Sequence, residues 1–407
     1  MDCVQDPGDL FSTKLISSGK GNGIILLKDL KASESKLQDK PIFSYTHYYS
    51  RKSAICCSNC FMNIGSLVEN LNHVLKMEGK YVSPELEAKI NSFKHQFPKI
   101  EGVKVMKCNS NCDFIFCSKE CLEAASGTHD TLCKLMKDEE KETWRLFERY
   151  ALKTHENFYF AGLIYINILY DSIYRNKPIK EWITKLNEFW SIPWDKLSTF
   201  DSNSTNPLDI ASESFNILET CLKRFKNMAI ENGEDVESLF SVGFYLGLLG
   251  IMDLVCVDIE IQNPLNDLLY NLLKDDKGKE LVYMLSKDLI DVYKIIRGVE
   301  EVPKDLNQLI ESKELFPDII GLGLFNFISK MNHSCAPNLE VDYGKNNIAN
   351  IIPLCDIREG DEATISYIDE NDSFENRQEK LLKNYGFVCE CTKCTLEGSN
   401  NNLEMKS

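Results

Sequence analysis

Residues 331–338 read MNHSCAPN and residues 389–394 read CECTKC, and these two stretches decide the fold. The second stretch supplies three thiols at C-x-C-x-x-C spacing, one short of the four ligands of a tetrahedral zinc site. Cys335 in the first stretch is the obvious fourth ligand. We therefore expect one zinc ion to tie the two stretches together, through Cys335, Cys389, Cys391 and Cys394.

In this order and spacing, the two stretches resemble the catalytic half of a SET domain with its post-SET zinc loop. Two neighbouring segments strengthen the resemblance. A Gly-Asp-Glu turn at 360–362 leads into a strand-like segment at 363–367, and Asn-Tyr-Gly-Phe at 384–387 precedes the cysteines. The SET domain is the fold of many protein lysine methyltransferases, which use S-adenosylmethionine as methyl donor. The resemblance therefore implies this cofactor and this activity.

A second group of soft ligands lies between residues 57 and 133, in pairs spaced C-x2-C, C-x3-C, C-x3-C and H-x3-C. The group resembles a MYND finger, in which the first and third pairs bind one zinc ion and the second and fourth pairs bind another. Cys56 competes with Cys57 as the first ligand, although Cys57 has the better spacing. With the post-SET loop, the resemblance implies three zinc ions in total. The implied finger ligands are Cys57, Cys60, Cys117 and Cys121 at one ion, and Cys108, Cys112, His129 and Cys133 at the other.

A MYND finger and a SET domain in one chain resemble the SET and MYND domain family of protein lysine methyltransferases. The implied fold class is α+β, a SET-domain β fold interrupted by the finger and by a long helical insertion. Since the chain ends at Ser407, we expect no tetratricopeptide-like domain after the zinc loop, unlike many animal members. The expected divisions are 1–55 (first part of the SET domain), 56–133 (finger), 134–315 (helical insertion), 316–380 (catalytic part) and 381–407 (post-SET loop and tail).

Two stretches are longer than the family pattern. The finger carries an insertion at 61–107, in which helix-start signals precede apolar residues at helical spacing. Residues 134–314 repeat apolar residues every three or four positions and predict helices, interrupted by loop signals at 202–207 and 298–303. The helix signals inside the finger insertion are Ser83, Pro84, Leu86, Ile90 and Phe93.

Residues 239–257 form a long apolar stretch with Gly243 and Gly247 at G-x-x-x-G spacing, which would suit a membrane helix. Asp253 is the single charge inside this stretch, and acidic residues flank both of its ends. A membrane helix usually has a basic flank on its cytoplasmic side. We therefore expect a buried core helix and no membrane association.

Four residues are candidates for the cofactor pocket. Lys20 and Asn22 lie in the GKGNG turn at 19–23, which resembles the glycine-rich opening of SET domains that wraps the methionine end of adenosylmethionine. Lys20 would supply a cation for the cofactor carboxylate, and Asn22 a side-chain amide. Asn332 and His333 resemble the family pair that holds the same cofactor. We expect His333 to position its neighbours, and not to act as an acid, a base or a zinc ligand.

Three aromatic residues complete the candidate site. Tyr367 ends the Thr-Ile-Ser-Tyr segment and matches the family tyrosine whose hydroxyl orients the lysine amine, so it is the candidate catalytic residue. Without the motif, a core tyrosine with a satisfied hydroxyl would be the simpler interpretation. Tyr385 and Phe387 alternate along an expected extended segment and would face one side, where family aromatics close the lysine channel and stack near the adenine.

Composition limits the partners and the compartment. The chain has 46 basic and 62 acidic side chains, a formal net charge of −16, which disfavours direct nucleic-acid binding. This charge suits a basic partner, but it also serves simple dispersal in solution. The remaining cysteines are scattered, so a reducing compartment, the cytoplasm or nucleus, is expected. Residues 1–20 lack the apolar core of a secretory signal.

Three functions stay open from the sequence. The first is a protein lysine N-methyltransferase, acting as a monomer on a histone tail or on a non-histone protein. The second is a catalytically weak scaffold whose finger recruits proline-rich peptides. The third is methylation of a small molecule or of another residue type, which a narrow channel and a protein-sized groove disfavour. Tyr367, Asn332 and Tyr385 favour the first, because a scaffold need not keep a lysine channel.

Overall fold

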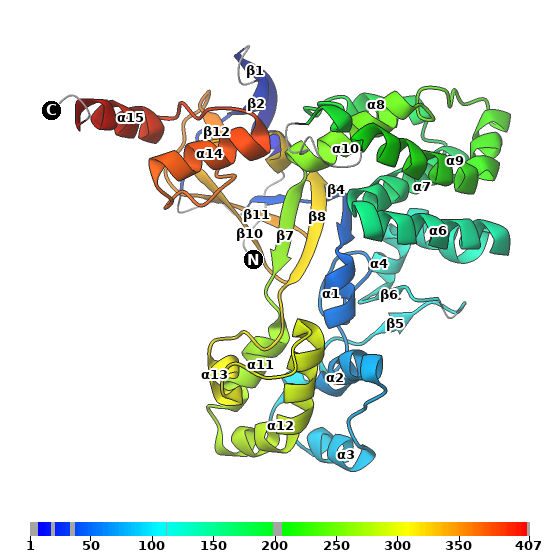
Figure 1. Ribbon diagram of the computed structural model, residues 1–407, viewed down its shortest axis with the longest axis vertical. Coiled ribbons are helices and arrows are strands. Elements are labelled where there is room, and N and C mark those ends of the chain that lie inside the picture. Colours follow the sequence, from blue (N-terminus) through cyan, green and yellow to red (C-terminus); the bar gives the residue numbers. More distant parts are fainter. Residues whose placement is uncertain (1–6, 18–20, 33–36, 111, 198–205, 405–407) are drawn as a thin grey trace.

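The computed structural model describes residues 7–17, 21–32, 37–110, 112–197 and 206–404, and Lys20 of the expected cofactor turn lies outside them. Small β-sheets form the centre, a layer of helices lies beside them, and a second group of helices lies at the far end (Figure 1). Strands and helices come mainly in separate runs, without the strand–helix alternation of a parallel α/β sheet. The predicted α+β class is confirmed.

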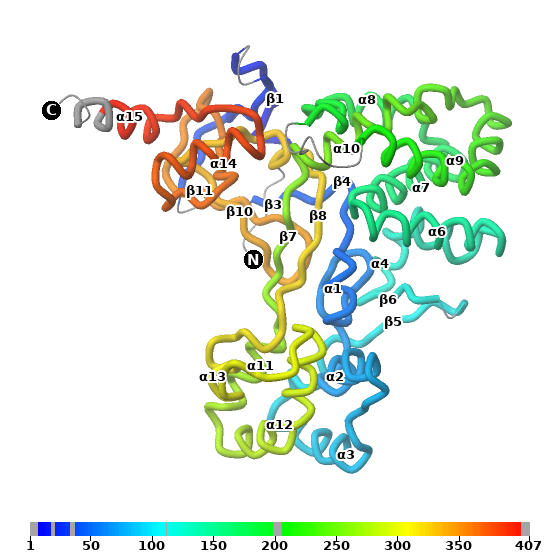
Figure 2. The backbone as a smooth tube through the Cα atoms, viewed as in Figure 1, coloured from blue at the N-terminus to red at the C-terminus, as the bar shows by residue number. Residues whose placement is uncertain are grey.

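Three sheets form the β core, and each combines strands from both ends of the chain. Figure 2 shows the blue N-terminal segments beside the orange C-terminal ones in this region. A split core of this kind is what the expected insertions require. The strand orders are β1 (Phe11–Ser17), β2 (Gly21–Leu26), β12 (Glu362–Ile365) and β9 (Asn332–His333); β10 (Leu339–Tyr343), β11 (Ala349–Pro353) and β3 (Leu37–Asp39); and β4 (Pro41–Thr46), β8 (Ile319–Phe325) and β7 (Val257–Ile261).

The register of the first sheet positions the candidate site. Strand β12 lies between β2 and β9, with Ala363 opposite Ile24 on one side and Ile365 opposite His333 on the other. Ala363 and Ile24 are fully buried, so the hydrophobic core fixes this pairing. Asn22 at the start of β2, the Asn-His pair in β9 and Tyr367 after β12 are thereby brought to one end of the sheet.

The helical layer consists of helices that share one large apolar cluster with β4. Within it, the Asp253 carboxylate of α10 accepts a 2.8 Å hydrogen bond from the Trp194 indole and another from the Asn157 amide. The apolar stretch at 239–257 therefore packs against the protein with its one carboxylate hydrogen-bonded. No helix in the described part of the chain combines the length and the apolar character that a membrane span requires. The helices are α6 (Asp138–Thr154), α7 (Asn157–Arg175), α8 (Ile179–Leu186), α9 (Pro207–Glu231) and α10 (Val242–Val255).

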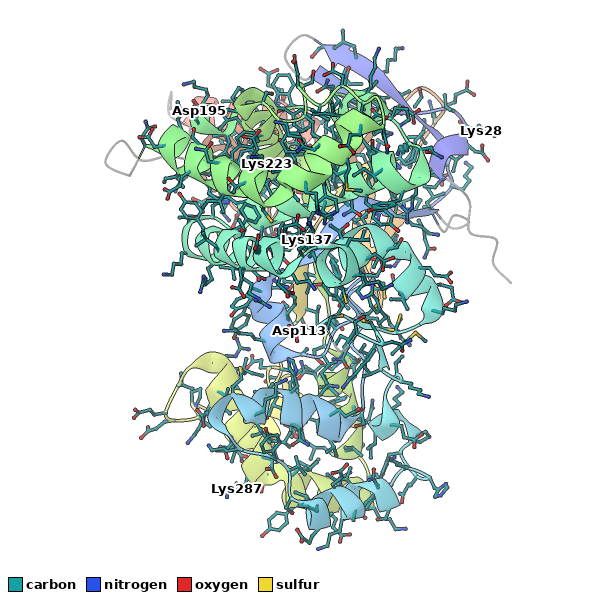
Figure 3. The ribbon with its side chains drawn as sticks, turned by 90° about the vertical axis from the view of Figure 1, so that its right-hand side faces the viewer. Lys28, Asp113, Lys137, Asp195, Lys223 and Lys287 are labelled. Atoms are coloured by element: carbon teal, nitrogen blue, oxygen red, sulfur yellow. The ribbon has the colours of Figure 1, made fainter. Side chains whose placement is uncertain are left out.

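A second helical group, here called the distal lobe, combines the finger insertion with the end of the long helical region. Its helices share one apolar cluster, although they come from two separate parts of the chain. The lobe lies at the lower end of Figure 1, and Lys287 marks it in Figure 3. Ser83 caps α3 by accepting a 3.2 Å hydrogen bond from the Leu86 N–H, as its sequence predicts. The lobe comprises α2 (Leu67–Leu75), α3 (Pro84–Ser92), α11 (Pro264–Leu272), α12 (Asp276–Arg297) and α13 (Leu306–Glu311).

The region expected to be helical contains a strand. β7 pairs antiparallel with β8 over its whole length, and its residues alternate between exposed Asp258 and Glu260 and buried Ile259 and Ile261. This period of two is that of a half-buried strand. Residues 257–261 therefore belong to the β core and separate the helical layer from the distal lobe, which corrects the expectation of helices alone between 134 and 314.

The finger lies between the β core and the distal lobe. Asn70 of α2, which is only 1% exposed, joins finger and lobe: its oxygen accepts from the Ile55 N–H at 3.1 Å and its amide donates to the Ile64 carbonyl at 2.9 Å. The finger contains β5 (Met106–Lys107), β6 (Ile115–Phe116), α4 (Lys119–Ala124), α5 (Ser126–Asp130) and a π turn at Thr131–Leu135. The other helices are α1 (Tyr48–Ser53), α14 (Phe374–Tyr385) and α15 (Thr392–Glu404).

Candidate active site and metal centres

The three expected ligand sets each come together in space. In every set the four ligand atoms lie within 4.8 Å of one another. In the finger, two sulfur pairs are separated by 3.4 Å and 3.3 Å, near the edge of roughly 3.8 Å of a tetrahedron with 2.3 Å zinc–sulfur bonds. All of these cysteines are free of disulfides, so each set fits one zinc ion. The sets are Cys57, Cys60, Cys117 and Cys121; Cys108, Cys112, His129 and Cys133; and Cys335, Cys389, Cys391 and Cys394.

Neighbouring contacts orient two finger positions. His129 Nε2 lies 3.5 Å from the Cys112 sulfur, while its Nδ1 lies 3.0 Å from an oxygen of Asp130. A carboxylate on the second ring nitrogen fixes the ring and leaves Nε2 for a metal. Cys57, and not Cys56, joins the ligand set. Burial raises the pKa of Cys56 to about 12, so its thiol stays protonated.

The third ligand set joins the catalytic turn to the last helix. The Cys335 sulfur lies 3.5 Å from that of Cys394 and 4.0 Å from that of Cys389, and all three residues are buried. Cys335 follows β9 directly, whereas Cys394 lies in the first turn of α15. A zinc ion held here would connect the Asn-His pair to the C-terminal segment.

A cavity of about 990 Å³ lies beside this third set. Small-molecule sites commonly have volumes of about 300–1,000 Å³, so a cofactor and part of a substrate fit within it. Its wall combines the glycine turn, the turn around β9, the segment after α14 and the helical layer. The structure thus brings together every expected pocket residue in its described part: Asn22, Asn332, His333, Tyr367, Tyr385 and Phe387.

The opposite wall of the cavity was not anticipated from the sequence. Gly243 and Gly247 of α10 line it, and a Cβ added at Gly243 would meet no atom within 4 Å. Trp190, which is 63% exposed, also lines the cavity and lies 3.9 Å from the position of a Cβ on Gly21. The G-x-x-x-G spacing was therefore the available signal, and its two glycines leave room on the cavity side of a helix whose Phe244 and Leu248 also line the cavity.

Asn332 braces the glycine turn against β12. Its amide nitrogen donates to a Glu362 carboxylate oxygen at 2.7 Å and to the Asn22 carbonyl at 3.3 Å. A Cβ on Gly23 would lie only 2.6 Å from that nitrogen, so a side chain at this position would displace the Asn332 amide. In this structure the Asn332 amide donates to protein groups, and its contribution to the pocket is to hold the turn in place.

His333 connects the third ligand set to Tyr367. Its Nδ1 accepts the Tyr367 backbone N–H at 3.0 Å, and its Nε2 lies 3.2 Å from the Cys335 sulfur. Because a backbone N–H can only donate, Nδ1 must be unprotonated, and the ring proton lies on Nε2, facing the sulfur. Burial, with a smaller effect from the positive charge of Arg377, lowers the pKa of His333 to about 4. The ring is therefore neutral at pH 7.

Tyr367 lines the cavity. The hydroxyl donates to the Met331 carbonyl at 2.5 Å, and the ring lies 4.9 Å from that of Tyr385. Burial raises the pKa of Tyr367 above its usual value, with further increases from Tyr385 and Glu362. The hydroxyl is therefore protonated at neutral pH, and its oxygen keeps acceptor capacity.

The segment that carries Tyr385 and Phe387 is not extended as expected. Tyr385 is the last residue of α14, and Gly386 ends the helix in the left-handed region at a φ of 76°. Glycine is favoured at this position because a side chain would strain the backbone. Both aromatic rings nevertheless line the cavity, because the left-handed turn returns Phe387 to the face on which Tyr385 lies.

The β core is assembled from both ends of the chain, and one cavity is lined by the glycine segment, the turn that carries Cys335, and Tyr367. This arrangement is that of the SET class of methyltransferase folds. The family model described as SET domain matches residues 21–368, and the chain belongs to this family.

Individual relatives cover most of the chain. The chain is 24% identical over 441 residues to "Histone-lysine N-methyltransferase ATXR2" of Arabidopsis thaliana, which covers 93% of this chain and 89% of that protein. It is 23% identical over 408 residues to "Protein-lysine N-trimethyltransferase SMYD5" of Homo sapiens, covering 96% and 87%. A shorter match, 41% identical over 86 residues, joins 21% of this chain to 19% of "N-lysine methyltransferase SMYD2" of Rattus norvegicus.

The resemblance to the SET and MYND domain family is confirmed by these comparisons and by the finger ligand sets. The expected adenosylmethionine-dependent protein lysine methyltransferase activity and the three zinc sites are confirmed with it. The domain boundaries and the roles of single pocket residues stay predictions.

Proposed function

We propose that this chain methylates lysine side chains of other proteins in the cavity described above, and that Tyr367 orients the reacting amine. The observation that supports this role is that Tyr367 lines the cavity while its hydroxyl donates its proton to the Met331 carbonyl at 2.5 Å. With its proton engaged in this way, the hydroxyl oxygen can accept a hydrogen bond from an amine in the cavity.

Tyr367 acts by position in this proposal. Adenosylmethionine, when bound, supplies the methyl group that is transferred. The raised pKa of Tyr367 keeps its hydroxyl protonated, so Tyr367 does not remove the proton of the lysine. Its oxygen instead fixes the direction of the amine lone pair. Such orientation of the reacting groups can lower an activation barrier by roughly 7 to 11 kcal/mol. The aromatic rings of Tyr367, Tyr385 and Phe387 on one wall favour the uncharged amine, because burial disfavours the ammonium form.

The other pocket residues hold this arrangement. Asn332 braces the glycine turn that contains Asn22, and His333 fixes the backbone of Tyr367. We assign Tyr385 and Phe387 to the closure of the lysine channel and to adenine contact, because both rings line the cavity. Lys20, outside the described residues, keeps its proposed role as partner of the cofactor carboxylate.

The proposed substrates are histone tails or other lysine-bearing proteins. The relatives are named histone-lysine and protein-lysine methyltransferases, which supports this class. A net charge of −16 favours a basic substrate. A proline-rich partner at the finger, a monomeric chain, and a place in the cytoplasm or nucleus are further proposals.

Tyr367→Phe tests the catalytic assignment. The substitution removes one oxygen and keeps the ring, so zinc content, melting temperature and adenosylmethionine affinity should change little. Turnover in a single-turnover methylation assay should fall by about 10- to 1000-fold, which is roughly 1.4 to 4 kcal/mol of transition-state stabilisation. The substrate is the protein that acquires radiolabel from adenosylmethionine in a cell lysate, identified by mass spectrometry.

Tyr343→Phe is the matched control. The Tyr343 hydroxyl is buried and has no hydrogen-bond partner among the described residues, so its loss should leave both rate and stability unchanged. Equal rates per folded molecule for wild type and Tyr367→Phe would remove Tyr367 from catalysis. Absence of any labelled protein with the wild type would favour the scaffold function instead.

A further inference from the structure

Arg377 is a buried arginine, and hydrophobic packing alone does not explain why a charged side chain is buried there. It lies on α14, and the residue is only 2% exposed. Arginine is almost never fully buried without a charged partner, since an uncompensated charge in the interior is strongly destabilising. The reason for its burial must therefore lie in the groups that surround its guanidinium.

The guanidinium lies against the third ligand set. Nη2 is 3.8 Å from the Cys394 sulfur and forms an ion pair with the Glu397 carboxylate of α15. Nη1 donates to the carbonyl of Asp372 at 2.5 Å, in the loop that follows Tyr367. One side chain thus connects the metal ligands, the last helix and the loop beside the candidate catalytic tyrosine.

The charges explain why a cation is favourable there. Four thiolates around one Zn²⁺ carry a net charge of −2, and Cys335, Cys389 and Cys394 are all buried. The His333 ring lies on one of these sulfurs and adds no charge, because its Nδ1 accepts the Tyr367 backbone N–H and therefore carries no proton. Arg377 is therefore a buried positive group that can offset thiolate charge at this site, whereas its partner Glu397 reaches solvent.

We propose that Arg377 is a positioning residue for the C-terminal zinc site, which stabilises the metal-bound thiolates and fastens them to the loop after Tyr367. This inference rests on zinc binding by the third ligand set and is independent of the proposed methyl transfer. Removal of the guanidinium should weaken one zinc site out of three, and the two finger sites provide controls within the same chain.

The experiment compares wild type, Arg377→Met and Arg377→Lys by chelator titration of the full chain at pH 7. Zinc per chain is measured by elemental analysis, and maleimide labelling of Cys391 and Cys394 against Cys57 identifies which site has been lost. Groups that support metal ligands commonly change metal affinity by 10- to 100-fold. In Arg377→Met, one zinc should leave at about 10- to 100-fold lower chelator than in wild type, with new labelling at Cys391 and Cys394 and none at Cys57.

Two further variants make the result decisive. Arg377→Lys keeps the charge but loses the planar fork, so it should release the same zinc at an intermediate chelator concentration. Arg297→Met removes an arginine of the distal lobe that donates to the Glu314 carbonyl, and it should leave all three sites unchanged. Unchanged release of the third zinc in both Arg377 variants would overturn the proposal. Joint release of all three ions in the Arg377→Lys variant would also overturn it, since the effect would then be a general loss of folding.

Discussion

Gly23→Ala adds one methyl group where the glycine turn meets the Asn332 side chain. An added Cβ would lie 2.6 Å from Asn332 Nδ2, 2.7 Å from Ile16 Cγ1 and 2.9 Å from Glu362 Oε1. Real Cβ atoms essentially never come within 3.0 Å of such neighbours, so something must move. Two of these three atoms are the partners of one 2.7 Å hydrogen bond. The substitution should therefore break the hydrogen bonds through which the Asn332 amide links β2 to β12.

The magnitude follows from these contacts. Overpacking of a tight site costs about 1 to 3 kcal/mol, and a hydrogen bond to a charged group contributes about 1.5 to 3 kcal/mol. Because the two effects act on the same atoms, they do not add. A loss of about 1 to 3 kcal/mol in cofactor binding corresponds to a fall in adenosylmethionine affinity of roughly 5- to 150-fold.

Calorimetric titration with adenosylmethionine measures this effect directly, with a thermal melt of each variant beside it. Gly344→Ala is the control, since its Cβ would meet only the Asn350 amide, at an ordinary 3.8 Å. The control should bind like wild type. If Gly23→Ala also binds like wild type, the glycine turn does not contact the cofactor and the pocket has been misplaced.

Two other predictions concern zinc and pH. Elemental analysis should find three zinc ions per chain, and one ion or none would contradict the ligand sets. Because structural zinc commonly contributes on the order of 10 kcal/mol to folding, chelation should unfold the finger and release the C-terminal segment. The single-turnover rate should rise with pH as the substrate lysine, with a reference pKa of about 10.4, loses its proton. Since burial keeps Tyr367 protonated, Tyr367→Phe should show the same slope at a lower rate, and a flat profile in the variant would identify Tyr367 as the base.

The metal sites could be predicted from sequence because their signal is local. Paired cysteines at short spacing leave few ways to complete a tetrahedron, and the interleaved finger sets match the expected pairing. The choice of Cys57 over Cys56 also follows from spacing, since Cys57 and Cys60 stand in the usual C-x2-C relation. Ligand identity is thus fixed by chemistry that acts over only a few residues.

Elements that depend on distant partners could not be predicted in the same way. Residues 257–261 become a strand because β8 lies beside them, and their alternation of apolar and acidic residues, the one local strand signal, spans only five residues inside a long helical pattern. Tyr385 reads as part of an extended segment, but α14 continues to it and stops only at Gly386. The G-x-x-x-G spacing of α10 is visible in the sequence, but the sequence does not show that the two glycines face a cavity.

The distal lobe gives the finger a further role in folding. Helices α2 and α3 lie between the first two ligand pairs, but their apolar faces pack on α11, α12 and α13, which follow β7. Neither part of the lobe buries its apolar face alone, so both must meet before either is stable. Asn70 fixes the junction with the finger. The two zinc ions of the finger bind ligands on both sides of α2 and so restrict α2 before it packs on α12. The chain between the two helices then behaves as a shorter loop, which lowers the entropy cost of bringing α2 and α12 together. Loss of finger zinc should therefore destabilise α12, although no ligand lies on that helix.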